Sequence, residues 1–301
     1  MVVYLEKTAE NLSRIAPNCI KNRFDLCGSE NCCLIRYRDK KEDLTLMVRH
    51  EGNRAWLGLY LVPISERALK KIVRFIFKAN KNTEQISYEY GYQATGTNSV
   101  VQNHFRIRLP ETPELLDERL SKKGRYNIAR EKRILEQEFG EWAVHEYDSE
   151  DSAAAEAWGT YFQFKAVTHG SAWAEYDWRR YRQQYGVSTV YTMTLGQENK
   201  IAAVILSCEQ CPVTYIENLT YDTELSRYSP GQVLYDEYLK NLIRKGKKEI
   251  FLLGGNYAYK KRYGSEEEQV YRCSVIRNEA WIRFKVWCYG VLVKMRILKD
   301  K

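Results

Sequence analysis

The chain has 301 residues, of which 44% are hydrophobic and 29% charged, and its formal net charge is +8. This composition excludes an intrinsically disordered chain, and no stretch reaches the roughly 18–20 apolar residues of a membrane-spanning helix. The excess of Lys and Arg favours an anionic partner, such as a phosphate-rich cofactor, RNA or a membrane surface.

The first hundred residues read as strands, one helix and a further strand. Alternating apolar residues separated by polar turns predict the strands. Ser65 is a suitable N-cap for the helix, whose apolar residues recur at helical spacing. The predicted elements are strands at Cys33–Arg38, Leu44–His50 and Trp56–Leu61, a helix at Ser65–Asn80 and a strand at Gln85–Tyr90.

The middle of the chain alternates between strands and helices. Pro113–Phe139 is predicted to be one long basic helix, either a solvated face or the wall of a groove for an anionic acceptor or RNA. Aromatic residues are dense around the loop Thr168–Asp177, which suggests core packing or a lid over an acceptor. The other predicted elements are strands at His104–Leu109, Trp142–Tyr147, Val190–Leu195 and Ile201–Ser207, and helices at Ser149–Val167 and Trp178–Gln184.

The stretch Thr214–Gly264 predicts a strand–helix–strand unit. Thr214–Tyr221 has the aromatic and β-branched residues of a strand, followed by a polar loop at Asp222–Tyr228. Ser229-Pro230-Gly231 opens the helix, with Ser as a plausible cap and Pro suited to its first turn. A second strand follows at Glu249–Leu253. Such a unit joins parallel strands, and the N-terminus of its helix favours a phosphate group.

The order and spacing of several motifs in this stretch resemble the GNAT acyltransferase superfamily. The match is closest to the long, two-copy CelD-like branch, which is named for a cellulose-biosynthesis acetyltransferase. It is carried by Tyr221-Asp222, Arg227-Tyr228-Ser229-Pro230-Gly231, Leu253-Gly254-Gly255, Tyr259-Lys260-Lys261-Arg262-Tyr263-Gly264, and a patch at Leu120-Ser121-Lys122-Lys123 with Arg125 and Arg130. The resemblance covers roughly residues 115–272 and fades over the first hundred.

The resemblance implies an α+β or α/β fold with two tandem GNAT-like mixed sheets flanked by helices, of which the second copy is complete. The expected domains are a degenerate copy at residues 1–110, the acyltransferase domain at 111–278 and a helical segment at 279–301. That last segment is expected to pack across the two copies, to lie on a membrane surface or to form a dimer contact.

The resemblance also implies that acetyl-CoA is the co-substrate and that its pyrophosphate lies at the helix start. Carried over by position, the phosphate loop comprises Arg227, Tyr228, Ser229, Gly231 and Gln232. The usual loop has Gln or Arg where this chain has Tyr228, and Gly or Ala where it has Val233. A branched Val at that position is expected to crowd the phosphate.

Acyl transfer from a thioester to an amine requires a base near the amine and an acid near the departing thiolate. Glu217 is a carboxylate inside an apolar strand, a position that tends to raise a carboxyl pKa and suits a general base. An ion pair with a neighbouring Arg or Lys is the structural alternative. Tyr257 and Tyr259 follow the second strand, where GNAT enzymes often place the Tyr that protonates the thiolate. Either Tyr could instead serve packing.

The cysteines suggest neither a metal centre nor a disulfide framework. Cys27 and Cys32-Cys33 have only His50 as a nearby partner, so a second pair of zinc ligands is missing. Cys208 and Cys211 flank a predicted hairpin turn, whereas a redox pair usually sits at a helix start. We therefore expect no metal and, because the N-terminus lacks a signal-peptide pattern, a cytoplasmic protein with free thiols.

The resemblance, together with the positive charge, implies three alternative functions. The first is an N-acetyltransferase that acts on an amine acceptor, such as an amino sugar of a surface-polysaccharide precursor. The second is a Fem-type aminoacyl transferase, which shares the two-copy fold but uses aminoacyl-tRNA; the basic segment and the positive charge would suit tRNA. The third is a non-catalytic module on the same scaffold that binds anions or nucleic acid.

Overall fold

A computed structural model describes residues 1–6, 8, 11, 31–59, 62, 64–90, 97–209, 214–254 and 258–277. The chain forms two compact units. Within the described ranges, the first unit takes residues up to 99 together with those from 271 onward, and the second takes residues 100–270. The predicted helical segment at 279–301, Cys27 and Cys211 lie outside the described residues.

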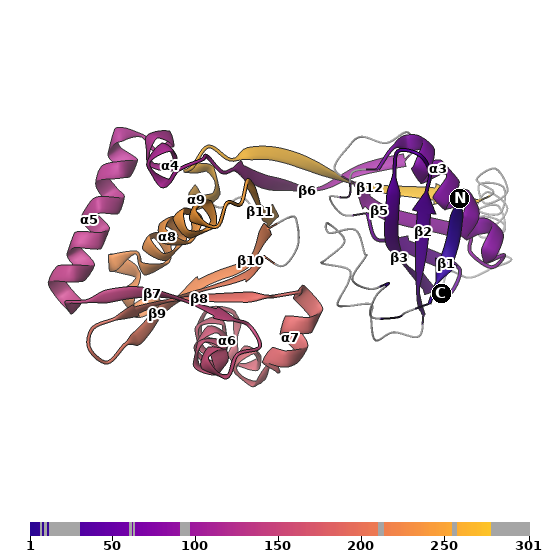
Figure 1. Cartoon of the computed structure of the whole chain (residues 1–301). Helices are drawn as coiled ribbons and strands as arrows, with labels where there is room; N and C mark the ends of the chain where they lie inside the picture. Colours follow the sequence, from indigo (N-terminus) through magenta and orange to yellow (C-terminus); the bar gives the residue numbers. More distant parts are fainter. Residues whose placement is uncertain are drawn as a thin grey trace, which may run out of the picture. The chain divides into compact units, whose positions relative to one another are not determined.

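The first unit is a mixed sheet with one helix on a face (Figure 1). Its strand order is β1-β2-β3-β4-β5-β12, in which only β4 and β5 pair in parallel. Helix α3 connects these parallel strands and buries an apolar stripe that includes Leu69, Ile72 and Ile76. The element bounds are β1 Val2–Leu5, β2 Cys32–Arg38, β3 Asp43–Glu51, β4 Arg54–Leu57, α3 Glu66–Ala79, β5 Gln85–Tyr90 and β12 Glu266–Ile276.

The second unit repeats this topology. Strands β8, β9 and β10 are antiparallel, β10 is joined through helix α8 to the parallel strand β11, and β6 pairs antiparallel with β11. The first unit has the same sequence of pairings in β2-β3-β4, α3, β5 and β12. The mixed α/β fold class is therefore confirmed, whereas the domain division at 110 and 278 stays a prediction. The strand bounds are β6 Thr97–Arg108, β7 Trp142–Asp148, β8 Thr189–Leu195, β9 Lys200–Cys208, β10 Thr214–Tyr221 and β11 Glu249–Gly254.

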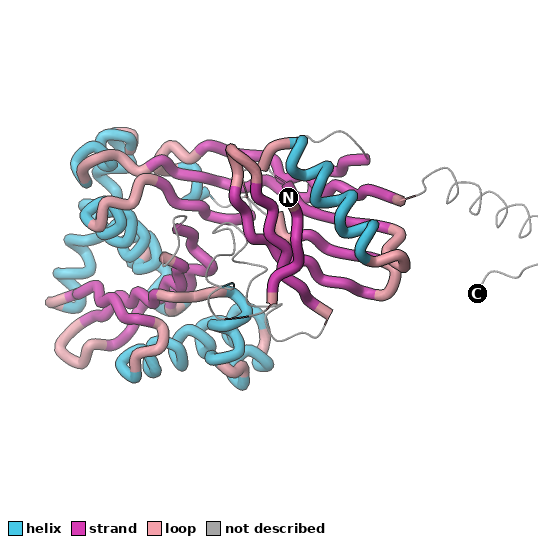
Figure 2. The backbone as a smooth tube through the Cα atoms, turned by 45° about the vertical axis from the view of Figure 1, so that its right-hand side comes forward, coloured by secondary structure: helices cyan, strands magenta, loops and turns pink. Residues whose placement is uncertain are grey.

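Helices cover both faces of the second sheet (Figure 2). One face packs against α5 and α8, and its buried cluster includes Leu135, Tyr191, Val233 and Tyr238. The opposite face packs against α6 and α7 around Trp158, with Val204 and Leu206 of β9. The helix bounds are α4 Pro113–Arg119, α5 Lys122–Phe139, α6 Ala155–His169, α7 Trp178–Tyr185, α8 Pro230–Arg244 and α9 Ala258–Lys261.

The predicted long helix at Pro113–Phe139 is wrong, because it is two helices. Leu120 is extended and ends α4, and the Ser121 hydroxyl accepts a hydrogen bond from the Gly124 amide to cap α5. A Ser that satisfies a free amide at the start of a helix favours a new helix over continuation of the old one.

The polar segment before α8 also differs from the prediction. Residues Thr223–Tyr228 form a 3-10 helix, η4, instead of a loop. Ser229 precedes α8 but forms no side-chain cap, since its backbone is left-handed with φ 55° and ψ 42°. The sequence pattern located the helix start correctly and assigned Ser229 the wrong role.

A buried ionic network ties α8 to two neighbouring segments. The Asp236 carboxylate is fully buried and accepts hydrogen bonds from Lys132 Nζ at 2.7 Å and the Tyr263 hydroxyl at 2.7 Å. Lys240 Nζ lies 3.1 Å from the same carboxylate. Burial disfavours its ionisation, but Lys132, Tyr263 and Lys240 outweigh this effect and hold the pKa of Asp236 below its ordinary value.

We expect Asp236→Ala to lower the free energy of unfolding by about 3–5 kcal/mol, because it removes the buried charge that Lys132 and Lys240 share and leaves the buried Tyr263 hydroxyl without its acceptor. The control is Asp117→Ala, which removes a half-exposed partner of Lys240 and should cost less than about 1 kcal/mol. Urea denaturation followed by circular dichroism measures both. Equal losses in the two variants would contradict a stabilising role for the buried network.

Candidate active site

Strand β10 has a β-bulge at Glu217. The register with β9 shifts between Ile216, which faces Ser207, and Asn218, which faces Leu206, so Glu217 is the extra residue. Bulges commonly re-aim a side chain beside an active site. The Glu217 side chain is half-buried, and its charge acts on Tyr161 and Tyr181 of α6 and α7. The carboxylate therefore belongs to the side of the sheet that α6 and α7 cover.

Strands β10 and β11 separate soon after they pair. Among the described residues of the two strands, the parallel pairing consists of Thr214 with Ile250 and Tyr215 with Phe251. Near its end β11 has an irregular register with β6, and Leu253 adopts a left-handed φ of 54°. The carboxyl ends of the two parallel strands thus part beside the N-terminus of α8.

A cavity of about 300 Å³ lies on the α8 side of this opening. Its walls come from the end of β10, from η4, from the first turns of α8 and from α9. Free N–H groups and the positive end of the helix dipole favour an anion at the start of α8. The lining residues are Leu219, Tyr221, Ser226, Ser229, Gly231, Gln232, Tyr235 and Tyr259.

Gly231 provides space at the cavity wall. A Cβ added there would lie 3.0 Å from Tyr221 Cδ1 and 3.2 Å from Leu219 Cδ2. Val233 is fully buried in the core cluster and does not line the cavity. Val233 would therefore not crowd a phosphate bound in this cavity.

The structure brings some of the predicted site residues together and separates others. Ser229, Gly231, Gln232 and Tyr259 line the cavity. Tyr228 is 8% exposed, packs edge-on against Phe139 and donates a hydrogen bond to Glu138 of α5.

Arg227 and Glu217 do not line this cavity. Arg227 lies over the Tyr228 ring, 4.5 Å from its centroid. Glu217 is associated with the other face of the sheet, and Tyr257 lies outside the described residues. The alignment placed Arg227 and Tyr228 in the loop, but the 3-10 helix turns the Tyr228 side chain inward.

Of the motif Tyr259–Gly264, Arg262 adjoins the cavity and Lys260 binds the end of β11, although the sequence pattern assigned neither residue a role. Arg262 donates a hydrogen bond to the side-chain oxygen of Gln232, which places a guanidinium next to the cavity. Lys260 is 2% exposed and donates to the carbonyl oxygens of Leu252 at 2.6 Å and Leu253 at 3.2 Å. The consecutive basic residues Lys260-Lys261-Arg262, in the loop region after a predicted strand, were the available signal.

Burial lowers the pKa of Lys260 to about 8. An unfolded chain holds this proton up to about pH 10.5, so between these values the unfolded state binds more protons than the folded state. Stability therefore rises with pH in this window, by up to about 1.4 kcal/mol per pH unit.

We expect Lys260→Met to lose this rise between pH 8 and 9.5, so that its deficit relative to the wild type grows with pH. The control is Lys261→Met, which removes a half-exposed ammonium 3.8 Å from Glu267. Urea titrations at several pH values measure the effect. A constant difference between Lys260→Met and the wild type across the window would contradict the lowered pKa.

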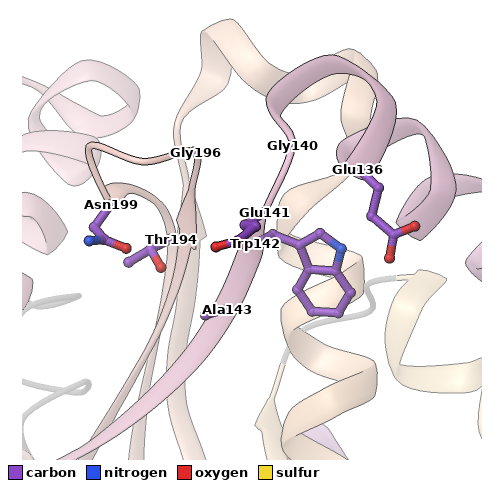
Figure 3. Close-up of a pocket in the computed structure, with 8 residues that line it drawn as sticks. All are labelled: Glu136, Gly140, Glu141, Trp142, Ala143, Thr194, Gly196 and Asn199. Atoms are coloured by element: carbon purple, nitrogen blue, oxygen red, sulfur yellow. The ribbon is translucent and has the colours of Figure 1, made fainter.

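A second cavity, of about 450 Å³, lies between the end of α5, the start of β7 and the β8–β9 hairpin (Figure 3). Glu136, Glu141 and Trp142 contribute to its lining, with Thr194 and Asn199 on the hairpin side. Carboxylates repel phosphate groups, so the cavity at Gly231 is the better candidate for an anionic donor.

The start of α3 in the first unit is already occupied by a side chain of the protein. Glu42 accepts hydrogen bonds from the Ser65 amide at 2.8 Å and the Ser65 hydroxyl at 2.7 Å. This carboxylate takes the place in which a phosphate would meet the helix N-terminus.

Metal-ligating side chains do not gather elsewhere in the described part of the chain. Cys33 Sγ lies 3.8 Å from His50 Nε2, but no group of three or more His, Cys, Asp or Glu is placed to hold an ion among these residues. Within the same ranges, every helix is too short or too polar to span a bilayer.

Comparison with known proteins agrees with this geometry. Residues 122–261 match the family model described as acetyltransferase (GNAT) domain. The match includes Glu217, the start of α8 and the cavity residue Tyr259. The second unit thus carries a GNAT-type domain, whereas nothing in the comparison distinguishes the CelD-like branch. A search of curated proteins finds no match.

Several solved structures share the fold over nearly the whole chain. A crystal structure of FemX has a TM-score of 0.66 at 9% identity. The match covers 94% of this chain and 99% of the FemX chain. L-PGS from Bacillus licheniformis has a TM-score of 0.58 at 11% identity and covers 91% and 93%. A conserved protein of unknown function from Bacteroides thetaiotaomicron reaches 0.57 at 11% identity and covers 92% and 100%. At these identities the likeness extends to the fold alone.

Proposed function

We propose that this protein is an N-acetyltransferase of the CelD-like branch. It would transfer acetyl from acetyl-CoA to an amine such as an amino sugar of a surface-polysaccharide precursor, in the cytoplasm. The observation that carries the proposal is the cavity at the start of α8, beside parallel strands that part after two residue pairs. This arrangement offers a phosphate site next to an opening in the sheet.

The residues of the cavity fit a pyrophosphate. Gly231 allows close approach to the backbone amides of the first turn, which donate hydrogen bonds to phosphate oxygens. Ser229 and Gln232 add polar side chains, and the guanidinium of Arg262, held on Gln232, adds a positive charge. Arg262 would thus provide the positive charge that the family resemblance assigns to Arg227.

Acetyl-CoA, when bound, supplies an acyl thioester, whose carbonyl carbon the acceptor amine attacks as the C–S bond breaks. In this mechanism Glu217 accepts a proton from the amine, directly or through a water. Tyr259 lines the cavity and would return a proton to the thiolate sulfur; Tyr257 is the other candidate for this acid.

A Fem-type aminoacyl transferase is the second candidate. It is favoured by an exposed stripe on α5, where Lys122, Tyr126, Arg130 and Arg133 recur at helical spacing. Positive charges interleaved with an exposed aromatic ring suit an RNA backbone and unstacked bases. A non-catalytic module that binds anions or nucleic acid would use the same surfaces without acyl transfer.

Calorimetric titration of the purified chain with acetyl-CoA and with bulk tRNA tests these candidates. Micromolar binding of acetyl-CoA, together with thiol release when an amine is added, supports the acetyltransferase. Binding of tRNA without acetyl-CoA, and transfer from aminoacyl-tRNA, would replace it with the Fem-type reaction. Binding of either ligand with no transfer would indicate the non-catalytic module.

A further inference from the structure

Helix α6 carries a charge at the C-terminal end of its buried stripe. Ala157, Trp158, Tyr161, Phe162 and Lys165 are the buried residues of this helix and recur at helical spacing. An ammonium at such a position is costly unless it has a counter-charge or a ligand. Lys165 is 8% exposed, so most of its side chain is withdrawn from water.

Lys165 lies near an aromatic ring and is influenced by a carboxylate farther away. Its Nζ lies 5.4 Å from the centroid of the Trp173 ring. In the part of the chain that the structure describes, the ammonium forms no hydrogen bond and no ion pair. Burial lowers the pKa of Lys165, and the charge of Glu217 counteracts this in part. Lys165 and Glu217 therefore act on each other across the α6–β10 packing without direct contact.

Three aromatic rings cluster beside Lys165. The rings of Phe162, Trp173 and Tyr176 lie within 25° of parallel, with centroids 5.7–6.4 Å apart. Tyr176 is 36% exposed and Trp173 is half-buried. A flat apolar face, such as one side of a sugar ring, can pack against an exposed ring of this cluster.

We infer that Lys165 and Glu217 together bind a zwitterionic acceptor, an amine that also carries a phosphate or a carboxylate. The anion would lie on Lys165 and the ammonium on Glu217, with the ring against Trp173 or Tyr176. This inference rests on the proposed function, because it names the class of amine that the transferase accepts. It distinguishes the acceptor from an amino sugar that carries no anionic group, which would leave the ammonium of Lys165 without an anionic partner.

Binding of three sugars tests the assignment without acyl transfer. The probes are glucosamine 6-phosphate, glucosamine and glucose 6-phosphate, titrated calorimetrically into the full chain, with 2-amino-2-deoxyglucuronic acid as the carboxylate counterpart. We expect the zwitterions to bind at least tenfold more tightly than either single-charge sugar. The preference between glucosamine 6-phosphate and 2-amino-2-deoxyglucuronic acid identifies the anion.

Two variants should distinguish the contributions of the two charges to sugar binding. Lys165→Met should weaken glucosamine 6-phosphate and glucose 6-phosphate roughly ten- to a hundredfold, the usual range for a charge-assisted hydrogen bond, and leave glucosamine unchanged. Glu217→Gln should weaken the two amines and spare glucose 6-phosphate. Lys165→Arg should retain most of the affinity, and Lys40→Met, which removes an exposed Lys of the first unit, should alter none.

A merely structural Lys165 would give a different result. Lys165→Met would then lower the unfolding temperature and weaken all the sugars equally, or none of them, and the inference would be overturned. Acetyl-CoA binding without any binding of the zwitterions would overturn it as well, while the proposed function stands. The expected sugar pattern in a chain that fails to bind acetyl-CoA would support the acceptor site and reject the donor.

Discussion

Replacing Glu217 by Gln is expected to lower kcat roughly 10²–10⁴-fold, the usual contribution of general-base catalysis. The substitution keeps the shape of the side chain at the bulge of β10 and removes its basicity. Affinity for acetyl-CoA should change little, because Glu217 does not line the cavity at the start of α8. The loss should shrink at high pH, where the acceptor amine is already deprotonated.

Steady-state rates between pH 6 and 10, with thiol release as the readout, measure this effect. The matched control is Glu224→Gln, an exposed carboxylate on η4 that is expected to retain full activity. Full activity of folded Glu217→Gln at neutral pH would exclude Glu217 as the base and leave Tyr259 or a water in that role.

Gly231→Trp is expected to abolish binding of acetyl-CoA. Even a Cβ at this position would approach Tyr221 and Leu219 closely, and an indole would fill the cavity where the pyrophosphate meets the helix amides. Gly231→Ala should give an intermediate loss, because one methyl group can be accommodated by a small shift of the Tyr221 ring.

Calorimetric titration with coenzyme A checks the prediction, and circular dichroism checks that the variant folds. Gly159→Trp is the control, since no atom lies within 4 Å of a Cβ added at this exposed position of α6. If folded Gly231→Trp binds coenzyme A like the wild type, the assignment of the phosphate site to α8 is wrong.

Periodicity in the sequence was sufficient to place the elements around the candidate site. The apolar and β-branched run at Thr214–Tyr221 is strand β10, and Pro230-Gly231 begins α8, as the pattern predicts. The same reasoning singled out Glu217, since a carboxylate in an apolar strand conflicts with its neighbours. These features are local, so the sequence alone contains the information for them.

Side-chain direction could not be obtained in this way. Tyr228 aligns with the phosphate loop, but η4 and the left-handed Ser229 turn it towards Phe139 and Glu138. Arg262 joins the site through its hydrogen bond to Gln232, thirty positions earlier in the chain. Short motifs specify which residues are near one another in sequence, whereas the fold decides which face each residue reaches.

The sequence by itself determined a basic, globular α/β chain with a strand–helix–strand unit suited to a phosphate. It also identified Glu217 as a carboxylate within an apolar strand. The tertiary structure alone decided that Glu217 is a bulge residue, that β10 and β11 part beside the cavity, and that Lys165 acts on Glu217 from α6. The physical reason is that backbone propensity and amphipathic spacing depend on neighbours along the chain. Bulges, strand separation and the meeting of buried charges depend instead on how distant segments pack.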